Sequence, residues 1–182
     1  MKIAVVGIEN FPIGKKSLPD ERLDKLAPMY HSLKTTTVQI EFQDASHVKE
    51  ADAILCDNAS KLDLVLADLE LVEQRMEKEE TRQLFQKCKE ALEKETPLNE
   101  IPFTAEELKI LINSNLITIR PITFIDSKTM PPVPQVIKEA YYNSGMIVFF
   151  TGGEKVARAW PIKKGSTAPE SAGVIHSDLQ RG

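Results

Sequence analysis

The chain has 182 residues, which is enough for one ordinary domain, alone or with a small appendage. Hydrophobic residues make up 42% of it and charged residues 27%, a composition that excludes wholesale disorder. The net charge of −4 argues against a protein that holds nucleic acid mainly by neutralising phosphates, although it leaves room for a local basic face.

The sequence indicates neither a membrane anchor nor a disulfide framework. The apolar run at 3–6 is too short for a signal peptide, and no run approaches the roughly 20 residues that cross a bilayer. Cys56 and Cys88 lie in apolar surroundings without a pairing or metal-ligand spacing, so both are expected to be reduced core residues. We therefore expect a cytoplasmic protein with no membrane partner.

A strand and a helix are predicted to open the chain. Residues 2–7 form a short apolar run closed by glycine, typical of a strand buried on both faces of a parallel sheet. Pro19 and the two acidic residues after it begin a helix that Pro28 is expected to bend or shorten. The apolar positions of this helical pattern are Leu23, Leu26, Tyr30 and Leu33.

The next two apolar runs, 36–42 and 53–56, are predicted to be buried strands. Each is followed by an aspartate, Asp44 after the first and Asp57 after the second. Both could crowd one rim of a parallel sheet, which is the usual ligand edge of open α/β folds. The simpler interpretation is that they are ordinary loop or helix-cap residues.

A helical hairpin is predicted at 62–95. An apolar stripe with helical spacing runs to Met76, is interrupted by the polar stretch 77–81, and resumes at Leu84. We interpret this as two helices that meet near Glu79. Because neither glycine nor proline occurs there, 79–81 could instead be a bend in one helix.

The pattern then returns to short elements. Thr104 and Glu107 form a capping box, which predicts a helix through Ile112. Residues 117–125 have β character, with Pro121 favouring an edge or an irregular start. Strand and helix patterns thus alternate along 1–126, which predicts an α/β fold with a parallel or mixed sheet and flanking helices.

The remaining residues predict a helix, a hairpin and a short final helix. The prolines at 131–134 mark a joint and the start of a helix that stops at Gly145. Two β-prone runs around 152–153 predict the hairpin, and a helix begins at Thr167. A two-stranded hairpin is marginally stable alone, so 146–151 should pair with another element, for which a second subunit is one candidate.

Basic residues surround the aromatic side chains of this hairpin. Positive charge with exposed aromatics suits a surface for RNA or protein, although such aromatics more often form the hairpin core, which is the interpretation we favour. The candidate partner-binding residues are Lys155, Arg158, Trp160, Lys163 and Lys164.

The stretch VVGIENFPIGKKS at 5–17 has the outline of a phosphate-binding loop. A working loop has four residues between its glycines and places its lysine and serine in the first turn of a helix. Here six residues separate the glycines, Pro19 disfavours a helix at Leu18, and Pro12 removes an amide donor. The candidate nucleotide-binding residues are Gly7, Gly14, Lys15, Lys16, Ser17 and Asp44. The spacing favours a solvated turn.

No catalytic or metal site is predicted elsewhere. His176, Ser177 and Asp178 contain the residue types of a hydrolase triad, but adjacency in sequence is not the required geometry and no nucleophile elbow precedes them. The histidines and cysteines have no metal-motif spacing.

Four blocks of this sequence resemble the Obg-like ATPases, the YchF-type branch of P-loop GTPases. They are PDERLDKLA at 19–27, VQIEFQDA at 38–45, LVLADLELVEQRM at 64–76 and RAWPIKKGSTAPESAGVIHSDLQRG at 158–182. The last and most specific block resembles the opening half of that family's TGS domain, a β-grasp module. The resemblance implies a reduced G-domain-like region at 1–126 and a truncated TGS-like region at 127–182, with an incomplete β-grasp hairpin and helix.

The same resemblance implies that the nucleotide machinery is lost. Gly7 would correspond to the first glycine of the family's phosphate loop, and Asp44 to its metal-supporting aspartate. Gly14 stands five residues before Pro19, like a family glycine well downstream of that loop, so Lys15 would not be the phosphate lysine. The loop helix, the glycine-rich switch, the base-reading segment and the final TGS strands are expected to be missing.

Phosphoryl transfer depends on positioning and charge stabilisation, so little chemistry should survive these losses. The expected function is a non-catalytic binding or regulatory protein without a cofactor, whose protein or ribosomal partner is implied by the resemblance. The alternative is a protein that binds Mg-ATP or Mg-GTP and hydrolyses it slowly. Direct nucleic-acid binding is not favoured, and homo-oligomers through an open strand edge are a further expectation.

Overall fold

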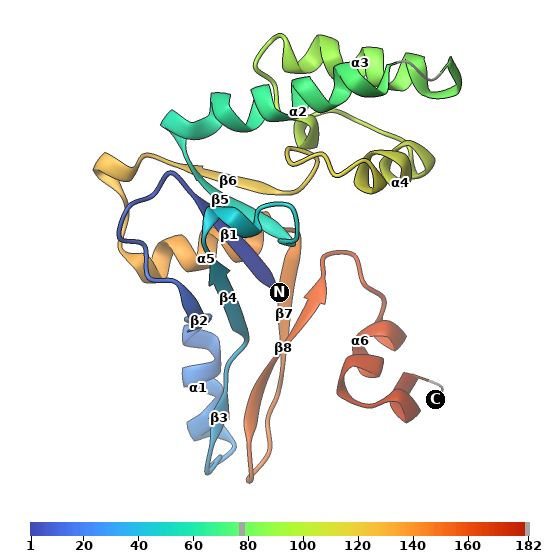
Figure 1. The fold of residues 1–182 in the computed structure, drawn as a ribbon. Coiled ribbons are helices and arrows are strands. Elements are labelled where there is room, and N and C mark those ends of the chain that lie inside the picture. Colours follow the sequence, from blue (N-terminus) through green and yellow to red (C-terminus); the bar gives the residue numbers. More distant parts are fainter. Residues whose placement is uncertain (77–78, 181–182) are drawn as a thin grey trace. The chain divides into compact units, whose positions relative to one another are not determined.

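The computed structural model describes residues 1–76 and 79–180 (Figure 1). Its contacts divide the chain into two compact units. Unit 1 comprises Met1, Gly14–Glu41 and Pro131–Gly182, and unit 2 comprises Lys2–Ile13 and Phe42–Met130. The sequence suggested a boundary after residue 126, close to the last of these divisions. It did not indicate that residues 14–41 group with the C-terminal segment.

A parallel sheet forms the centre of unit 2, with β1 (Lys2–Val6), β5 (Ala53–Asp57) and β6 (Ile122–Ile125) in that order. Ile3 lies opposite Ala53, and every residue of β5 is buried. These are the strands that the apolar runs predicted, because a strand covered on both faces needs apolar side chains on both. β4 (Gln39–Gln43) is the neighbour of β1 on the side away from β5, and its last two residues belong to unit 2.

Two predicted strands have different boundaries in the structure. The run 36–42 is split between β3 (Thr35–Thr36), which joins a separate sheet in unit 1, and β4. Continuous β propensity hides this break, because propensity carries no information about which sheet a residue joins. The run 117–125 is a strand only in β6, since the amides of Ile117 and Thr118 bind a side chain instead.

Three helices of unit 2 enclose a hydrophobic core of their own. They are α2 (Lys61–Arg75), α3 (Arg82–Leu92) and α4 (Ala105–Asn113), and α4 has the predicted capping box. Two helices are present where the polar interruption predicted them; Glu79–Thr81 forms a 3₁₀ turn, and the rest of the predicted junction, 77–78, lies outside the described residues. The buried residues of this core are Val65, Val72, Phe85, Cys88, Ala91, Leu92, Leu98, Leu111 and Leu116.

Both cysteines are core residues, as predicted. Cys56 and Cys88 are 0% exposed and free. Burial raises the pKa of each thiol to about 12, so neither is a reactive thiolate near neutral pH.

A buried carboxylate connects α2 to the segment before β6. Asp68 is 0% exposed and accepts hydrogen bonds from the Ile117 amide at 2.7 Å and from both the amide and the hydroxyl of Thr118 at 2.6 Å. Burial raises the pKa of Asp68, while these donors favour its ionised form. Asp68 was not singled out from the sequence, because its partners Ile117 and Thr118 lie about 50 residues further along the chain.

Unit 1 contains the second sheet, in the order β3-β8-β7. β7 (Met146–Thr151) and β8 (Ala157–Lys163) form the predicted antiparallel hairpin, and β3 pairs in parallel with β8. The hairpin thus gains β3 as a third strand from its own chain. We expected the added strand to pair with 146–151, but β3 pairs with β8 instead. Within the described residues, β7 is an edge strand.

The other elements of unit 1 are α1 (Glu21–Met29), α5 (Val133–Asn143), α6 (Ala168–Ile175) and β2 (Gly14–Ser17), which neighbours β4. Pro28 lies in the last turn of α1, and the helix ends there as predicted. The predicted apolar stripe is wrong beyond that point, because Tyr30 and Leu33 are 47% and 89% exposed. None of the helices in the described part of the chain could span a bilayer.

Replacing Asp68 with alanine should destabilise unit 2 by about 3 kcal/mol, because the change leaves buried amides of Ile117 and Thr118 without an acceptor. Urea unfolding measures the effect. Glu70→Ala, an exposed acidic position on the same helix, is the matched control and should change stability by less than about 0.5 kcal/mol. Equal effects of the two substitutions would contradict this role for Asp68.

Candidate functional site

The loop after β1 is packed into unit 2. Ile8 and Phe11 are 9% and 5% exposed, and the Phe11 ring lies 5.0 Å from that of Phe42, centroid to centroid. A phosphate loop instead curls consecutive amides around an anion. This loop is therefore held by apolar contacts that point its side chains into the core.

Gly7, at the end of β1, lies directly against Ser60. A Cβ atom at position 7 would be 2.1 Å from the Ser60 hydroxyl oxygen, and the backbone is left-handed with φ of +73°. The close contact leaves no room for a Cβ atom, and the left-handed backbone favours glycine. The glycine that suggested a phosphate loop is thus explained by a close contact within unit 2.

The two candidate aspartates of unit 2 are helix caps, as the simpler interpretation held. Asp44 accepts hydrogen bonds from the amide of Ser46 at 2.9 Å and from its hydroxyl, and these bonds lower the pKa of Asp44. Asp57 caps the turn Asn58–Ser60 and accepts a 2.5 Å hydrogen bond from the Ser127 hydroxyl, which lowers its pKa. Both carboxylates are occupied by neighbouring residues.

The Gly-Lys-Lys-Ser motif lies in unit 1, where it forms β2. Lys15 and Ser17 are exposed, and the Ser17 hydroxyl accepts a 2.8 Å hydrogen bond from Gln39. A phosphate loop needs its lysine and serine at a helix N-terminus, whose free amides bind the anion. Gly14, Lys15, Lys16 and Ser17 thus belong to one unit, and Gly7 and Asp44 to the other.

In unit 2, the residues expected at a phosphate site are engaged in other contacts. The loop that should wrap the phosphates is packed through Phe11, and Asp44 is engaged as a cap. Within 1–76 and 79–180, no cluster of three or more histidine, cysteine, aspartate or glutamate residues could hold a metal ion.

One face of the β7–β8 hairpin carries a stack of aromatic rings with a cation on top. Phe149 and Trp160 lie opposite each other in the strand pair, with ring centroids 6.3 Å apart and planes 14° from parallel. The Arg158 guanidinium lies 3.9 Å from the Trp160 centroid, within the range of a cation–π contact. The Trp160 ring nitrogen donates a 2.9 Å hydrogen bond to Thr151. The stack is therefore fixed in position.

The structure brings together only part of the predicted partner-binding set. Arg158 and Trp160 touch, with Arg158 exposed and Trp160 partly buried. Lys155 lies in the hairpin turn, whereas Lys163 and Lys164 lie at the other end of β8, and all three are exposed. The result is a strand with positive charge at both ends and a cation-covered aromatic stack between them.

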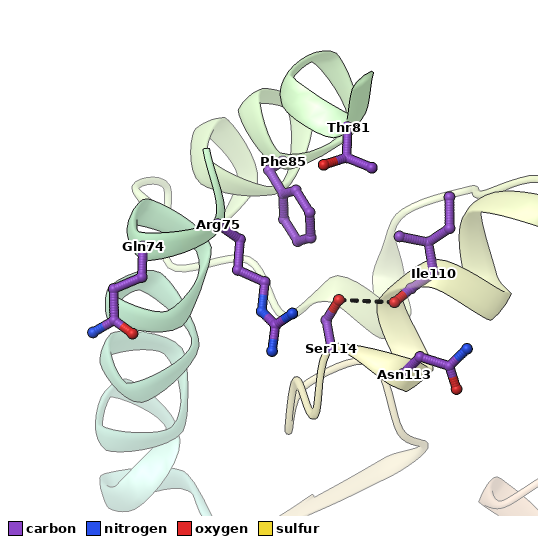
Figure 2. Close-up of a pocket in the computed structure, with 7 residues that line it drawn as sticks. All are labelled: Gln74, Arg75, Thr81, Phe85, Ile110, Asn113 and Ser114. Atoms are coloured by element: carbon purple, nitrogen blue, oxygen red, sulfur yellow. Dashed lines mark hydrogen bonds between the residues drawn. The ribbon is translucent and has the colours of Figure 1, made fainter. Parts of the chain in front are cut away.

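A pocket of about 530 Å³ opens among α2, α3 and α4 of unit 2 (Figure 2). Buried Phe85 contributes an apolar wall, and Arg75 extends toward Ser114, whose hydroxyl donates a 2.8 Å hydrogen bond to the Ile110 carbonyl. The residues around it are Gln74, Arg75, Thr81, Phe85, Ile110, Asn113 and Ser114. They include no carboxylate, histidine or cysteine, so these side chains suit binding better than acid–base or nucleophilic chemistry.

Sequence reasoning missed the exposed end of α1 and the loop after it, where Met29 and Leu33 are 75% and 89% exposed. The helical spacing assigned Leu33 to the core side of a helix. The available signal was Pro28, which ends the helix before Leu33 can join that stripe.

A family model, curated relatives and a solved structure are similar to this chain. The family model YchF-GTPase_C, described as a protein of unknown function (DUF933), matches residues 146–182. The Ribosome-binding ATPase YchF of Bacillus subtilis is 26% identical over 278 residues, covering 93% of this chain and 76% of that protein. The solved structure of the Schizosaccharomyces pombe YchF GTPase has a TM-score of 0.79 at 18% identity, covering all of this chain and 85% of that one. In sequence over most of its length, and in fold, this chain is similar to the YchF-type Obg-like ATPases.

The resemblance that the sequence blocks suggested is thus confirmed, and so is the α/β fold. Similarity is uneven along the YchF-type relatives: Obg-like ATPase 1 of Gallus gallus is 40% identical over 57 residues, which cover 31% of this chain and 14% of that protein. The alignment with the Bacillus subtilis protein is longer than this whole chain. That relative therefore contains residues that have no counterpart here.

Phe11→Ala should destabilise the protein by about 3 kcal/mol, because it removes a buried ring that packs against Phe42. The matched control is Ile13→Ala, in the same loop but 48% exposed, which should change stability by less than about 0.5 kcal/mol. Chemical unfolding of the two variants gives the comparison. A Phe11 variant as stable as the wild type would mean that the loop is not anchored in the core.

Proposed function

We propose that this chain is a non-catalytic binding or regulatory protein of the YchF-type family, cytoplasmic and associated with the ribosome. The observation that carries the non-catalytic part is the packing of Phe11, which occupies the loop that would have to wrap a triphosphate. Phosphoryl transfer depends on a phosphate cradle, a lysine and metal ligands placed around one anion. The absence of counterparts for part of the Bacillus subtilis relative supports the same proposal.

The ribosomal part of the proposal has two supports. The Bacillus subtilis relative is named a ribosome-binding ATPase, and this chain aligns with 76% of it. The TGS-like region of unit 1 offers Lys155, Lys163, Lys164 and the Arg158–Trp160 stack, whose positive charge would complement a negatively charged ribosomal partner. The edge strand β7 is a second route to partners, including another copy of this chain, because its outer backbone groups can pair with an added strand.

The alternative is an ATP- or GTP-binding protein with slow hydrolase activity. It is favoured by similarity to an ATPase family and by the exposed Lys15, which is free to reach a bound phosphate. Under this alternative, Mg-ATP or Mg-GTP would bind at Gly7, Gly14, Lys15, Lys16, Ser17 and Asp44, after the loop beside Gly7 had rearranged.

Millimolar Mg-ATP and Mg-GTP should leave the melting temperature of the purified protein unchanged. A nucleotide present at about 100 times its dissociation constant would stabilise the fold by about 2.7 kcal/mol, which a thermal melt detects easily. The matched control is Lys15→Ala with Lys16→Ala. A nucleotide-induced shift that disappears in this double variant would establish the hydrolase alternative over our proposal.

Wild-type protein should co-sediment with purified bacterial ribosomes, and Lys163→Ala with Lys164→Ala should weaken this binding several-fold through loss of charge complementarity. Lys94→Ala with Lys109→Ala removes the same charge from exposed positions of unit 2 and should leave binding unchanged. Equal losses in both pairs would mean that only net charge matters. Wild-type protein that stays in the supernatant would refute the ribosomal proposal.

A further inference from the structure

Apolar side chains are displayed to solvent where the loop after α1 meets the turn of the β7–β8 hairpin. Leu33 and Met29 are 89% and 75% exposed, the two largest exposed fractions of any large hydrophobic residue in the described part of the chain. Tyr30 is 47% exposed, and Val156 in the hairpin turn is 36% exposed. We call these four residues the tip patch. All of them belong to unit 1.

Hydrogen bonds fix the loop to the hairpin turn. The Leu33 amide donates to the Glu154 carbonyl at 2.9 Å, and the Ser32 hydroxyl donates to the Gly153 carbonyl at 2.7 Å. The Ala157 amide donates to the Lys34 carbonyl at 2.9 Å, where β3 begins its parallel pairing with β8. The tip patch is therefore a preorganised surface rather than a loosely held loop, and a preorganised surface loses less entropy when it binds.

The backbone on both sides is adapted to this arrangement. A Cβ atom at Gly152 would lie 2.5 Å from a carbon of the Tyr30 ring, so the ring packs against a turn that has no side chain. His31 has a left-handed backbone with φ of 50°, which is uncommon for a residue other than glycine. The structure thus accepts local strain in a segment that leaves Leu33 and Met29 in water.

The charges around the tip patch indicate what it fits. The two segments that form it, 29–34 and 152–156, carry exposed Lys34 and Lys155 against a single acidic residue, Glu154. This local positive charge contrasts with the net charge of −4 for the whole chain. A partner with an apolar depression bordered by carboxylates would complement both the centre and the rim.

Single-stranded nucleic acid is a poorer match for the same surface. Bases bind by stacking on aromatic faces, and Tyr30 is the one aromatic residue of the tip patch. Its ring already packs against Gly152, while Leu33, Met29 and Val156 are aliphatic. The chemistry of the centre therefore favours protein.

We propose that the tip patch docks into an acidic, apolar depression on a protein component of the ribosome. This inference rests on the proposed ribosomal function and names the surface and the partner chemistry for it. Leu33 and Met29 are its anchors, because exposed apolar side chains on a rigid support lose the most water-accessible surface on docking.

The test is co-sedimentation of the full chain with ribosomes purified from Bacillus subtilis. Met29→Ser with Leu33→Ser should weaken binding by about tenfold or more, as expected for removal of two interface anchors. Leu62→Ser with Leu66→Ser is the matched control, since these leucines are 45% and 48% exposed on α2, and it should bind like the wild type. Melting temperatures of both pairs establish that each is folded.

The outcomes separate the two proposals. Wild-type protein that does not co-sediment overturns the ribosomal function and the docking surface together. Wild-type protein that binds no better than the Met29/Leu33 variant overturns the docking surface alone, as does an equal loss in the control pair.

A photo-crosslink identifies the chemistry of the partner. The native Cys56 and Cys88 are 0% exposed, so a thiol introduced at the exposed position Glu154→Cys can be labelled selectively with a benzophenone. A crosslink to an acidic segment of a ribosomal protein supports the proposal. A crosslink to ribosomal RNA or to a basic protein segment overturns it.

Discussion

The packing of Phe11 against Phe42 determines what the first loop of this protein can do. With Phe11 in the core and Gly7 pressed against Ser60, the backbone after β1 is committed to contacts within unit 2. A loop that bound a triphosphate would have to expose this apolar ring or move it elsewhere. The occupied carboxylates of Asp44 and Asp57 are consistent with the same commitment, since each satisfies amides or hydroxyls beside it.

Local physical rules were enough to predict many elements of the fold. The apolar runs of β1 and β5, the capping box at Thr104 and the end of α1 near Pro28 each depend on a few neighbouring residues. The division of 36–42 between two sheets was not predictable in this way. It depends on the hydrogen bonds of β3 with β8, which lies over 100 residues further along the chain.

The candidate sites show the same limit. Strict spacing rules argued against a phosphate loop and needed only the sequence, but the reason for Gly7 is Ser60, a contact that no local pattern contains. In the hairpin, the sequence identified Arg158 and Trp160 among five candidate residues, and their spacing in β8 places these two on one face. Leu33 is held by the hydrogen bond from its amide to the Glu154 carbonyl. Because Glu154 is far away in sequence, the exposure of Leu33 was not predicted.

The interleaving of the two units has a consequence for the order in which the protein forms during translation. All residues of unit 2 have been synthesised once the chain reaches Met130, whereas unit 1 needs β7 and β8, which come later. Residues 14–41 belong to unit 1 and must therefore wait for β7 and β8, whereas unit 2 can already assemble. Because distant pairings of this kind slow folding, unit 1 should be the later and slower of the two to mature.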